Sequence, residues 1–190
     1  YTEDGAGIGI VCGKKKGVVA VDIDCMDADT AQWVQELALE RLGWAPVRVG
    51  QAPKSLLLYR VDLLSAEIPS YNLAFVPQGI TQKQLVETRV GGQQFVAYGV
   101  HPSTGLEYTW PEGDLAGVCP SDLTPIDADD LAGFFELLAQ KLKGAGTEIV
   151  QASSGGGGSE RGLADQDLLK ESTERLDEAM AYIPNTDEQF

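Results

Sequence analysis

The sequence predicts an α+β domain in which mixed or antiparallel sheets are flanked by helices. Short β-rich runs, most of them bounded by glycine, fill much of the first 110 residues, and two longer stretches have the apolar period of a helix. An apolar content of 43% with 7% aromatic residues is typical of a soluble globular domain. No run of about 18 apolar residues occurs, so we expect no membrane association.

The first half of the chain supplies five expected strands and one helix. The runs GIGIVCG (7–13) and GVVAVDID (17–24) are separated by a lysine turn, which indicates a hairpin. A helix is expected over 27–43, because acidic residues stand at its start and a glycine at its end. Further strands are expected at PVRVG (46–50), SLLLYRV (55–61) and YNLAFVP (71–77).

The second half continues the pattern and then changes in composition. Residues 84–102 predict two strands around a glycine pair, residues 103–110 a last strand, and residues 126–144 an amphipathic helix. We therefore expect one mixed domain over residues 1–145. A flexible Gly/Ser-rich linker is expected over 146–162 and a flexible helical tail over 163–190, the start of a truncated C-terminal region.

Charge and cysteine usage exclude several classes of protein. The net charge of −15 argues against coating of nucleic acid by bulk electrostatics. The first 110 residues carry nine basic against twelve acidic side chains, a net of −3, and the other 80 carry five against seventeen, a net of −12. A single histidine excludes a Cys/His zinc knuckle, and we expect three reduced cysteines, Cys12, Cys25 and Cys119, in a cytoplasmic protein.

Two aspartates end the apolar run of residues 17–24. Asp22 and Asp24 occupy alternate strand positions, so their side chains share one face, roughly 6.5 to 7 Å apart along the chain. Burying a lone charge is costly, so such a pair usually lies at a rim, has a partner, or binds a metal ion. Two carboxylates suit a divalent cation such as Mg²⁺. The alternative is a strand end that meets solvent, with Asp27 or Asp29 capping the next helix.

Three motifs in order connect this pair to a known family. The glycine-punctuated GIGIVCGKKKGVVAVDID ends in DxD, GQAPKSLLLYR leads into a strand, and VETRVGGQQFVAYGVHPSTGLEYTW carries an acid, a glycine pair and HP. The combination, over residues 7 to about 125, resembles the primase-polymerase (Prim-Pol) branch of the archaeo-eukaryotic primase superfamily, especially its phage and plasmid forms. The resemblance implies an RRM-like catalytic core within residues 1–145.

The resemblance also implies roles for individual residues. Asp22, Asp24 and Glu87 would be catalytic ligands of two Mg²⁺ or Mn²⁺ ions, although Glu87 could instead be an exposed acid beside Arg89. The second motif lacks the family's histidine, and Lys54 with Ser55 stands near its place. The remaining candidates for nucleotide or template contact are Arg48, Arg60, Gln93 and His101; the arginines could equally be solvated edge charges, and His101 could make a structural hydrogen bond.

The function implied is template-directed nucleotidyl transfer in phage or plasmid DNA replication, in the host cytoplasm if a phage encodes the protein. The implied partners are a DNA template and primer, nucleoside triphosphates (deoxynucleotides and possibly ribonucleotides), and a C-terminal helicase or primase-helper region absent from this chain. Two alternatives stay open at this point. The same acids would serve a metal-dependent nuclease, and the domain could be a catalytically inactive module of a replication complex.

Overall fold

The computed structural model describes residues 7–61 and 67–155, which form a mixed α+β fold as predicted. Its main sheet has the strand order β3-β4-β2-β6-β5-β9, and β8 pairs with β4 beside this path. These neighbours are antiparallel except for the parallel pair β4 and β8. The strands are β2 (Val18–Asp24), β3 (Val47–Arg48), β4 (Ser55–Val61), β5 (Ser70–Val76), β6 (Gln84–Arg89), β8 (Pro125–Ile126) and β9 (Glu148–Gly155).

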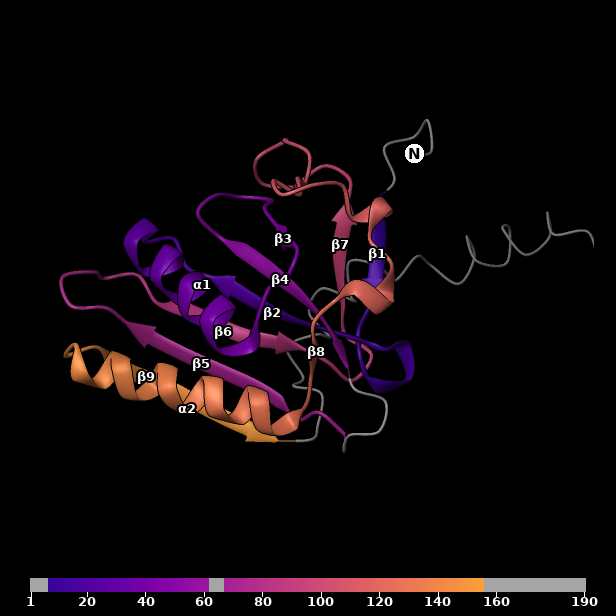
Figure 1. Ribbon diagram of the computed structural model, residues 1–190. Coiled ribbons are helices and arrows are strands. Elements are labelled where there is room, and N and C mark those ends of the chain that lie inside the picture. The colour runs from indigo at the N-terminus through magenta and orange to yellow at the C-terminus, as the bar shows by residue number, and fades with distance from the viewer. Residues whose placement is uncertain (1–6, 62–66, 156–190) are drawn as a thin grey trace, which may run out of the picture. The chain divides into compact units, whose positions relative to one another are not determined.

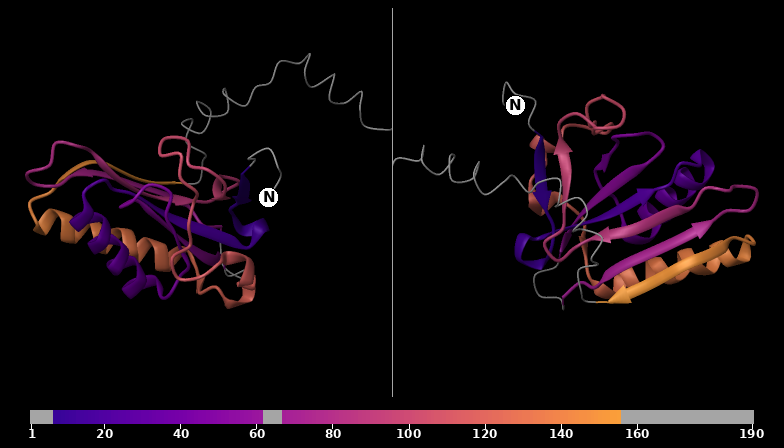
Figure 2. Two further views of the ribbon diagram at one scale, coloured as in Figure 1. Left: turned by 90° about the horizontal axis from the view of Figure 1, so that it is seen from above. Right: turned by 180° about the vertical axis from the view of Figure 1, so that it is seen from behind.

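Two helices, α1 (Ala28–Leu42) and α2 (Ala128–Gly144), cover one face of this sheet (Figures 1 and 2). Each begins where predicted, because an aspartate caps it: Asp27 accepts a hydrogen bond from the N–H of Thr30, and Asp127 from those of Asp129 and Asp130. Their apolar sides enclose the larger core, which includes Val21, Ile23, Leu57, Tyr59, Val86, Phe134 and Leu138. Neither helix is long and apolar enough to cross a bilayer, and no other helix in the described ranges is.

The opposite face of the main sheet carries a second, smaller core. There β1 (Ile8–Val11) and β7 (Gln94–Tyr98) form a separate two-stranded sheet. The short 3₁₀ helices η2 (Leu115–Gly117) and η3 (Pro120–Asp122) lie in the segment that leads to β8. The core residues here are Cys12, Ala20, Leu56, Leu58, Phe95, Ala97, Trp110 and Leu123. This second layer covers only part of that face of the main sheet. The side chains of the candidate site lie on the rest of it.

Two strand predictions are corrected by the structure. The expected hairpin of 7–13 with 17–24 is limited to one isolated bridge, between Gly13 and Val18: β1 pairs with β7, while β2 lies between β4 and β6. The reason is burial, because β2 is apolar toward both cores and suits a central strand, whereas β1 is mostly exposed. The second correction is that residues 103–110, expected as a strand, make only isolated bridges. The two strands predicted within 84–102 are confirmed, and they belong to different sheets.

The linker prediction is also corrected in part. Residues 148–155, expected within the linker 146–162, form β9 and pair with β5, so the sheet continues past the predicted boundary at 145. Almost all side chains of β9 are exposed, so its sequence has no apolar signature, and main-chain hydrogen bonding to β5 holds it in place. The predicted helical tail, 163–190, and residues 156–162 of the predicted linker lie outside the described residues.

Candidate active site

A row of cross-strand neighbours runs over the face of the main sheet that the helices leave open. Asp22 on β2 is the direct partner of Glu87 on β6 and of Leu56 on β4. The row continues at its two ends to Arg48, the partner of Leu56, and to Asn72, the partner of Glu87. Direct partners in antiparallel strands project from the same face. The sheet therefore brings the third predicted acid, Glu87, directly beside Asp22.

Asp24 lies one step further along β2 on this face, and a lysine contacts it. The pairing of Ile23 with Ser55 places Lys54, the residue before β4, opposite Asp24. The Lys54 Nζ atom is 2.6 Å from Asp24 Oδ1. The predicted phosphate-binding lysine thus already touches one of the predicted metal ligands.

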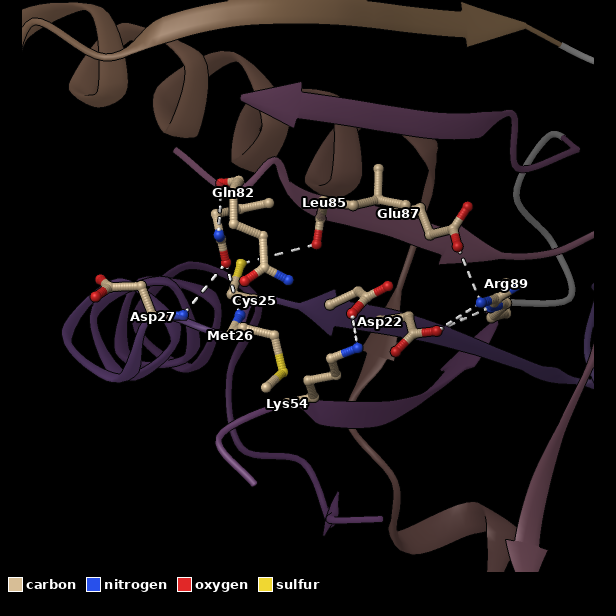
Figure 3. A network of polar contacts seen from close by, with 11 residues as sticks. Asp22, Cys25, Met26, Asp27, Lys54, Gln82, Leu85, Glu87 and Arg89 are labelled. Atoms are coloured by element: carbon tan, nitrogen blue, oxygen red, sulfur yellow. Dashed lines mark hydrogen bonds and ion pairs between the residues drawn. The ribbon is translucent and has the colours of Figure 1, made fainter. Parts of the chain in front are cut away.

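Arg89 holds the other two acids together. It follows Glu87 by two residues on β6, so it shares the same face. Its Nη2 atom is 2.6 Å from Asp22 Oδ2 and 2.9 Å from Glu87 Oε1, and its Nε donates to Asp22 Oδ2 over 3.1 Å. Figure 3 shows the guanidinium between the ends of the two carboxylate side chains. One cation therefore neutralises part of two acids from neighbouring strands.

The environment of Glu87 disfavours its negative charge. Burial raises the pKa of this carboxyl, the nearby charges of Asp22 and Asp24 raise it further, and Arg89 and a hydrogen bond from Asn72 act in the opposite direction. That hydrogen bond is long, 3.5 Å from Asn72 Nδ2 to Glu87 Oε2. A carboxylate crowded by like charges gains stability from any added positive charge. The site is thus electrostatically suited to a further cation.

A cavity of about 170 Å³ opens beside Asp22 and Asp24. Its lining includes four predicted nucleotide-binding residues, Arg48, Lys54, Ser55 and His101. Gly50, Gln51 and Tyr108 complete the wall. The hydroxyl of Ser55 is buried, and no hydrogen bond to it is found within the described residues. The cavity therefore joins two of the acids to cationic and polar groups.

Arg48 is held rigidly at this cavity. Its Nη1 donates to the Val96 carbonyl over 2.6 Å, and its guanidinium lies 4.6 Å from the ring centroid of Tyr108 and 5.7 Å from that of Phe95. Its Nε is buried and has no hydrogen-bond partner among the described residues. Burial lowers the pKa of Arg48 from its ordinary value, and the charge of Asp22 opposes that shift. A fixed guanidinium with a spare donor suits an anionic ligand.

The loop after β7 reaches the cavity because it is pinned to β3. Val49 and Thr109 exchange two main-chain hydrogen bonds of 2.8 Å, which puts the Tyr108 ring against Gly50. A Cβ atom on Gly50 would lie 2.2 Å from Tyr108 Cε1. His101 packs its ring 5.3 Å from that of Tyr108, and its Nδ1 accepts a hydrogen bond from the N–H of Ser103. Only glycine at position 50 permits this wall.

Two predicted contact residues lie outside the lining of the cavity. Arg60 is on β4 opposite Val18, several residues away from the acids, and its Nε is buried without a hydrogen-bond partner in the described part of the chain. The Gln93 side chain accepts the N–H of Val90, and its carbonyl accepts that of Cys12, so Gln93 closes the turn between β6 and β7. The contacts of Gln93 thus stabilise this turn, and Gln93 does not line the cavity.

Sequence reasoning missed two residues that shape the site. The bridging position of Arg89 was not predicted, although its i+2 spacing from Glu87 on a strand is the signal that it shares the acid's face. Gln84 is 1% exposed, and its Oε1 accepts hydrogen bonds from the N–H groups of Met26 (2.6 Å) and Asp27 (3.3 Å). Gln84 therefore fixes the connection that follows Asp24. The only signal of this role in the sequence was a polar residue at a strand position expected to be buried.

The acids fit a divalent cation in the chemistry of their ligand atoms. They supply only hard oxygen ligands, from one face of two adjacent strands. In the described part of the chain, no three Asp, Glu, His or Cys side chains are arranged to hold an ion. The oxygens of Asp22 and Glu87 face Arg89, and an oxygen of Asp24 faces Lys54. Two side-chain cations thus balance the charge that a metal ion would balance.

The class of protein to which this sheet and its acid-bearing face belong follows from comparison with known families. The model of the family described as bifunctional DNA primase/polymerase, N-terminal (Prim-Pol), matches residues 2–128. The chain belongs to this family. No curated protein and no solved structure compared with the chain matches it.

Proposed function

We propose that this protein is a DNA primase-polymerase that adds nucleotides to a primer on a DNA template, in phage or plasmid replication. The observation that carries the proposal is the direct cross-strand pairing of Asp22 with Glu87 beside a cavity lined by Lys54 and Arg48. Membership of the Prim-Pol family supports it. The reaction joins the primer 3′-oxygen to the α-phosphorus of a nucleoside triphosphate, breaks the bond to the β-phosphate and releases pyrophosphate.

The acids would hold the ions of this reaction. Asp22, Asp24 and Glu87 are the proposed ligands of two Mg²⁺ or Mn²⁺ ions, which, when bound, supply charge stabilisation to the attacking and leaving oxygens. Phosphoryl transfer depends mainly on positioning and electrostatic stabilisation. The work left to the chain is therefore to orient the carboxylates and to receive the triphosphate.

The cavity is suited to the phosphate end of the nucleotide. Its volume of about 170 Å³ is smaller than the roughly 300–1,000 Å³ of a pocket that encloses a whole drug-sized ligand. Arg48 offers a fixed guanidinium at the wall of the cavity, and Lys54 a partly exposed ammonium. We therefore assign the triphosphate to these two cations, with His101 and Tyr108 as further residues of the wall, and leave the base outside.

Primer extension tests the proposal directly. The chain is incubated with an end-labelled primer annealed to a longer template, deoxynucleotides and Mn²⁺, and the primer length is followed on a gel. Asp22→Asn and Glu87→Gln keep shape but remove a charged ligand, so extension should fall by more than about 100-fold, beyond the cost of losing an outer-shell partner. Asp29→Asn, an exposed site on α1 over the other face, is the matched control and should extend normally.

The same gel separates the alternatives. Growth of the primer that depends on both acids supports the proposal. Shortening of the primer would identify a metal-dependent nuclease, since water then replaces the 3′-hydroxyl as nucleophile. An unchanged primer would favour an inactive module, and undiminished extension by the Glu87 variant would remove Glu87 from the ligand set.

A further inference from the structure

Arg89 sits at the point where the charges of two acids meet. Its Nη2 lies within 2.9 Å of one oxygen from each of Asp22 and Glu87, and its Nε also donates to Asp22. Only 29% of the Arg89 side chain is exposed, against 17% for Asp22 and 19% for Glu87. The three groups are therefore a largely buried cluster rather than a loose surface ion pair.

This cluster explains how the ion-free protein tolerates its acids. Asp22, Asp24 and Glu87 share one face, and partial burial makes their mutual repulsion costly. A delocalised guanidinium bridges two carboxylates through separate N–H groups, which a single ammonium does less well. Removing the bridging cation would leave two poorly solvated negative charges on adjacent strands. Arg89 thus contributes to the stability of the sheet itself.

The same contact competes with ion binding. The oxygens that Arg89 engages are those that would bind a divalent cation, and a guanidinium and a dication repel each other. We infer that Arg89 is an internal counter-ion: it holds Asp22 and Glu87 in the ion-free protein and must leave these oxygens when a divalent cation binds. The inference rests on the proposed function, because it requires that the acids take a metal ion.

Lys54 is a weaker competitor for geometric reasons. It contacts only Asp24, and 31% of its side chain and 45% of that of Asp24 are exposed, so water can replace either partner. Arg89 engages two acids from two strands and is held in place by three donor contacts. Exchange of Arg89 for the ion is therefore the step that should set the affinity for the metal.

Calorimetric titration of the full chain with Mn²⁺ alone tests the inference. Arg89→Met removes the charge and keeps the length of the side chain. The dissociation constant of this variant should be at least about tenfold lower than that of the wild type, because removing one positive charge ~6 Å from a dication has that effect even at the dielectric constant of water. Arg41→Met, an exposed arginine on α1 over the opposite face, makes the same change in net charge and should bind as the wild type does.

Thermal unfolding gives a second readout. Without divalent ions Arg89→Met should unfold at a lower temperature than the wild type, because its acids are unbalanced. With saturating Mn²⁺ the two unfolding temperatures should converge, because the ion replaces the missing charge. Arg89→Lys keeps one charge but loses the bridge, so its dissociation constant for Mn²⁺ and its unfolding temperature should lie between those of the wild type and Arg89→Met. It replaces Arg89→Met in the test if that variant does not fold.

The outcomes are distinct for the two proposals. Clear binding of Mn²⁺ by the wild type, together with equal or weaker binding by the Arg89 variants, would overturn the inference that Arg89 is a counter-ion. Arg89 would then be a group that orients the ligands. If the wild type and the variants alike give no heat and no thermal shift with Mn²⁺, the acids bind no ion, and the proposed function fails together with the inference.

Discussion

Lys54 and Asp24 form an ion pair of 2.6 Å between Nζ and Oδ1, although both side chains are partly exposed, at 31% and 45%. Exposed pairs contribute little to stability, typically about 0–1 kcal/mol. Lys54 can therefore exchange this partner for a phosphate at small cost. We predict that Lys54→Met raises the KM for the incoming nucleotide by about tenfold, the loss of one charge-assisted contact. Steady-state primer extension over a range of nucleotide concentrations measures this.

The stability of this variant provides the control for a folding defect. Its free energy of unfolding should stay within about 1 kcal/mol of the wild type. Lys83→Met, an exposed lysine before β6, should leave the KM unchanged. An unaltered KM in Lys54→Met would remove this lysine from the triphosphate site.

Gly50 sets the position of one cavity wall. A methyl group at this position would approach Tyr108 Cε1 to 2.2 Å and His101 Cδ2 to 2.9 Å, so both rings must move in Gly50→Ala. Overpacking of this kind costs about 1–3 kcal/mol. We predict weaker binding of a nucleoside triphosphate, measured by calorimetry in the presence of Mn²⁺.

A double variant separates the clash from other effects. Gly50→Ala combined with Tyr108→Ala removes the two atoms that collide most closely and leaves only the 2.9 Å approach to His101, so the two stability losses should not add fully. If the losses add fully, the ring contact is not the cause, and the conformation of the 48–50 segment must be.

Gln84 anchors the chain where β2 leads into α1. Its Oε1 accepts the N–H groups of Met26 and Asp27, and its Nε2 donates to the Gln82 carbonyl over 2.8 Å. Gln84→Ala removes these hydrogen bonds and leaves the N–H groups of Met26 and Asp27 without their acceptor. We predict that the free energy of unfolding falls by about 1–3 kcal/mol. Urea denaturation measures the loss.

Gln82→Ala is the matched control for this prediction. Gln82 takes part only through its main-chain carbonyl, which the substitution retains, and its side chain is exposed. The two variants should therefore differ clearly in their urea midpoints. Equal midpoints would mean that water replaces the Gln84 amide.

The three cysteines differ in their accessibility to alkylating reagents. Cys12 and Cys25 are buried and Cys119 is exposed. Burial raises the pKa of both Cys12 and Cys25 to about 12, so almost no thiolate is present at neutral pH. We predict that iodoacetamide at pH 8 modifies one thiol in the folded protein and three in 6 M guanidinium. Mass spectrometry after Cys119→Ser should find none in the folded protein.

The same two thiols predict alkaline destabilisation. In the unfolded chain they ionise from about pH 8.5, whereas in the folded chain they stay protonated until about pH 12. Their contribution to stability is thus fully present below pH 8 and is lost as the pH rises toward 12. The slope should be about 1.4 kcal/mol per pH unit for each thiol. The free energy of unfolding, measured at several pH values from 8 to 11, should therefore fall less with pH in Cys25→Ala than in the wild type.

The strand periodicity of the sequence predicted an important part of the candidate site. Alternation on β2 predicts a shared face for Asp22 and Asp24, and the structure has both on the face away from the helices. Both helices were predicted to within a residue or two, because their aspartate caps and closing glycines are local signals. The family resemblance, and not the local pattern, drew attention to Glu87.

Features that depend on pairing could not be predicted in this way. A strand's partner is chosen by burial and by distant segments, so the assignment of β1 to β7 has no local signal. Strand β9 has a polar sequence because most of its side chains are exposed. The bridging role of Arg89 needed the register of β2 with β6, which places Ala20 opposite Arg89 and Asp22 opposite Glu87.

The central place of β2 in the sheet has a consequence for biosynthesis. Arg89 and Asp22 are 67 residues apart in the chain, yet they meet through one strand pairing. During translation the aspartates emerge long before their partner strand, so the ribosome-bound intermediate lacks both Glu87 and its balancing guanidinium. If the acids bind ions as proposed, that ability should arise in one step, when β6 docks, rather than increase gradually as synthesis proceeds.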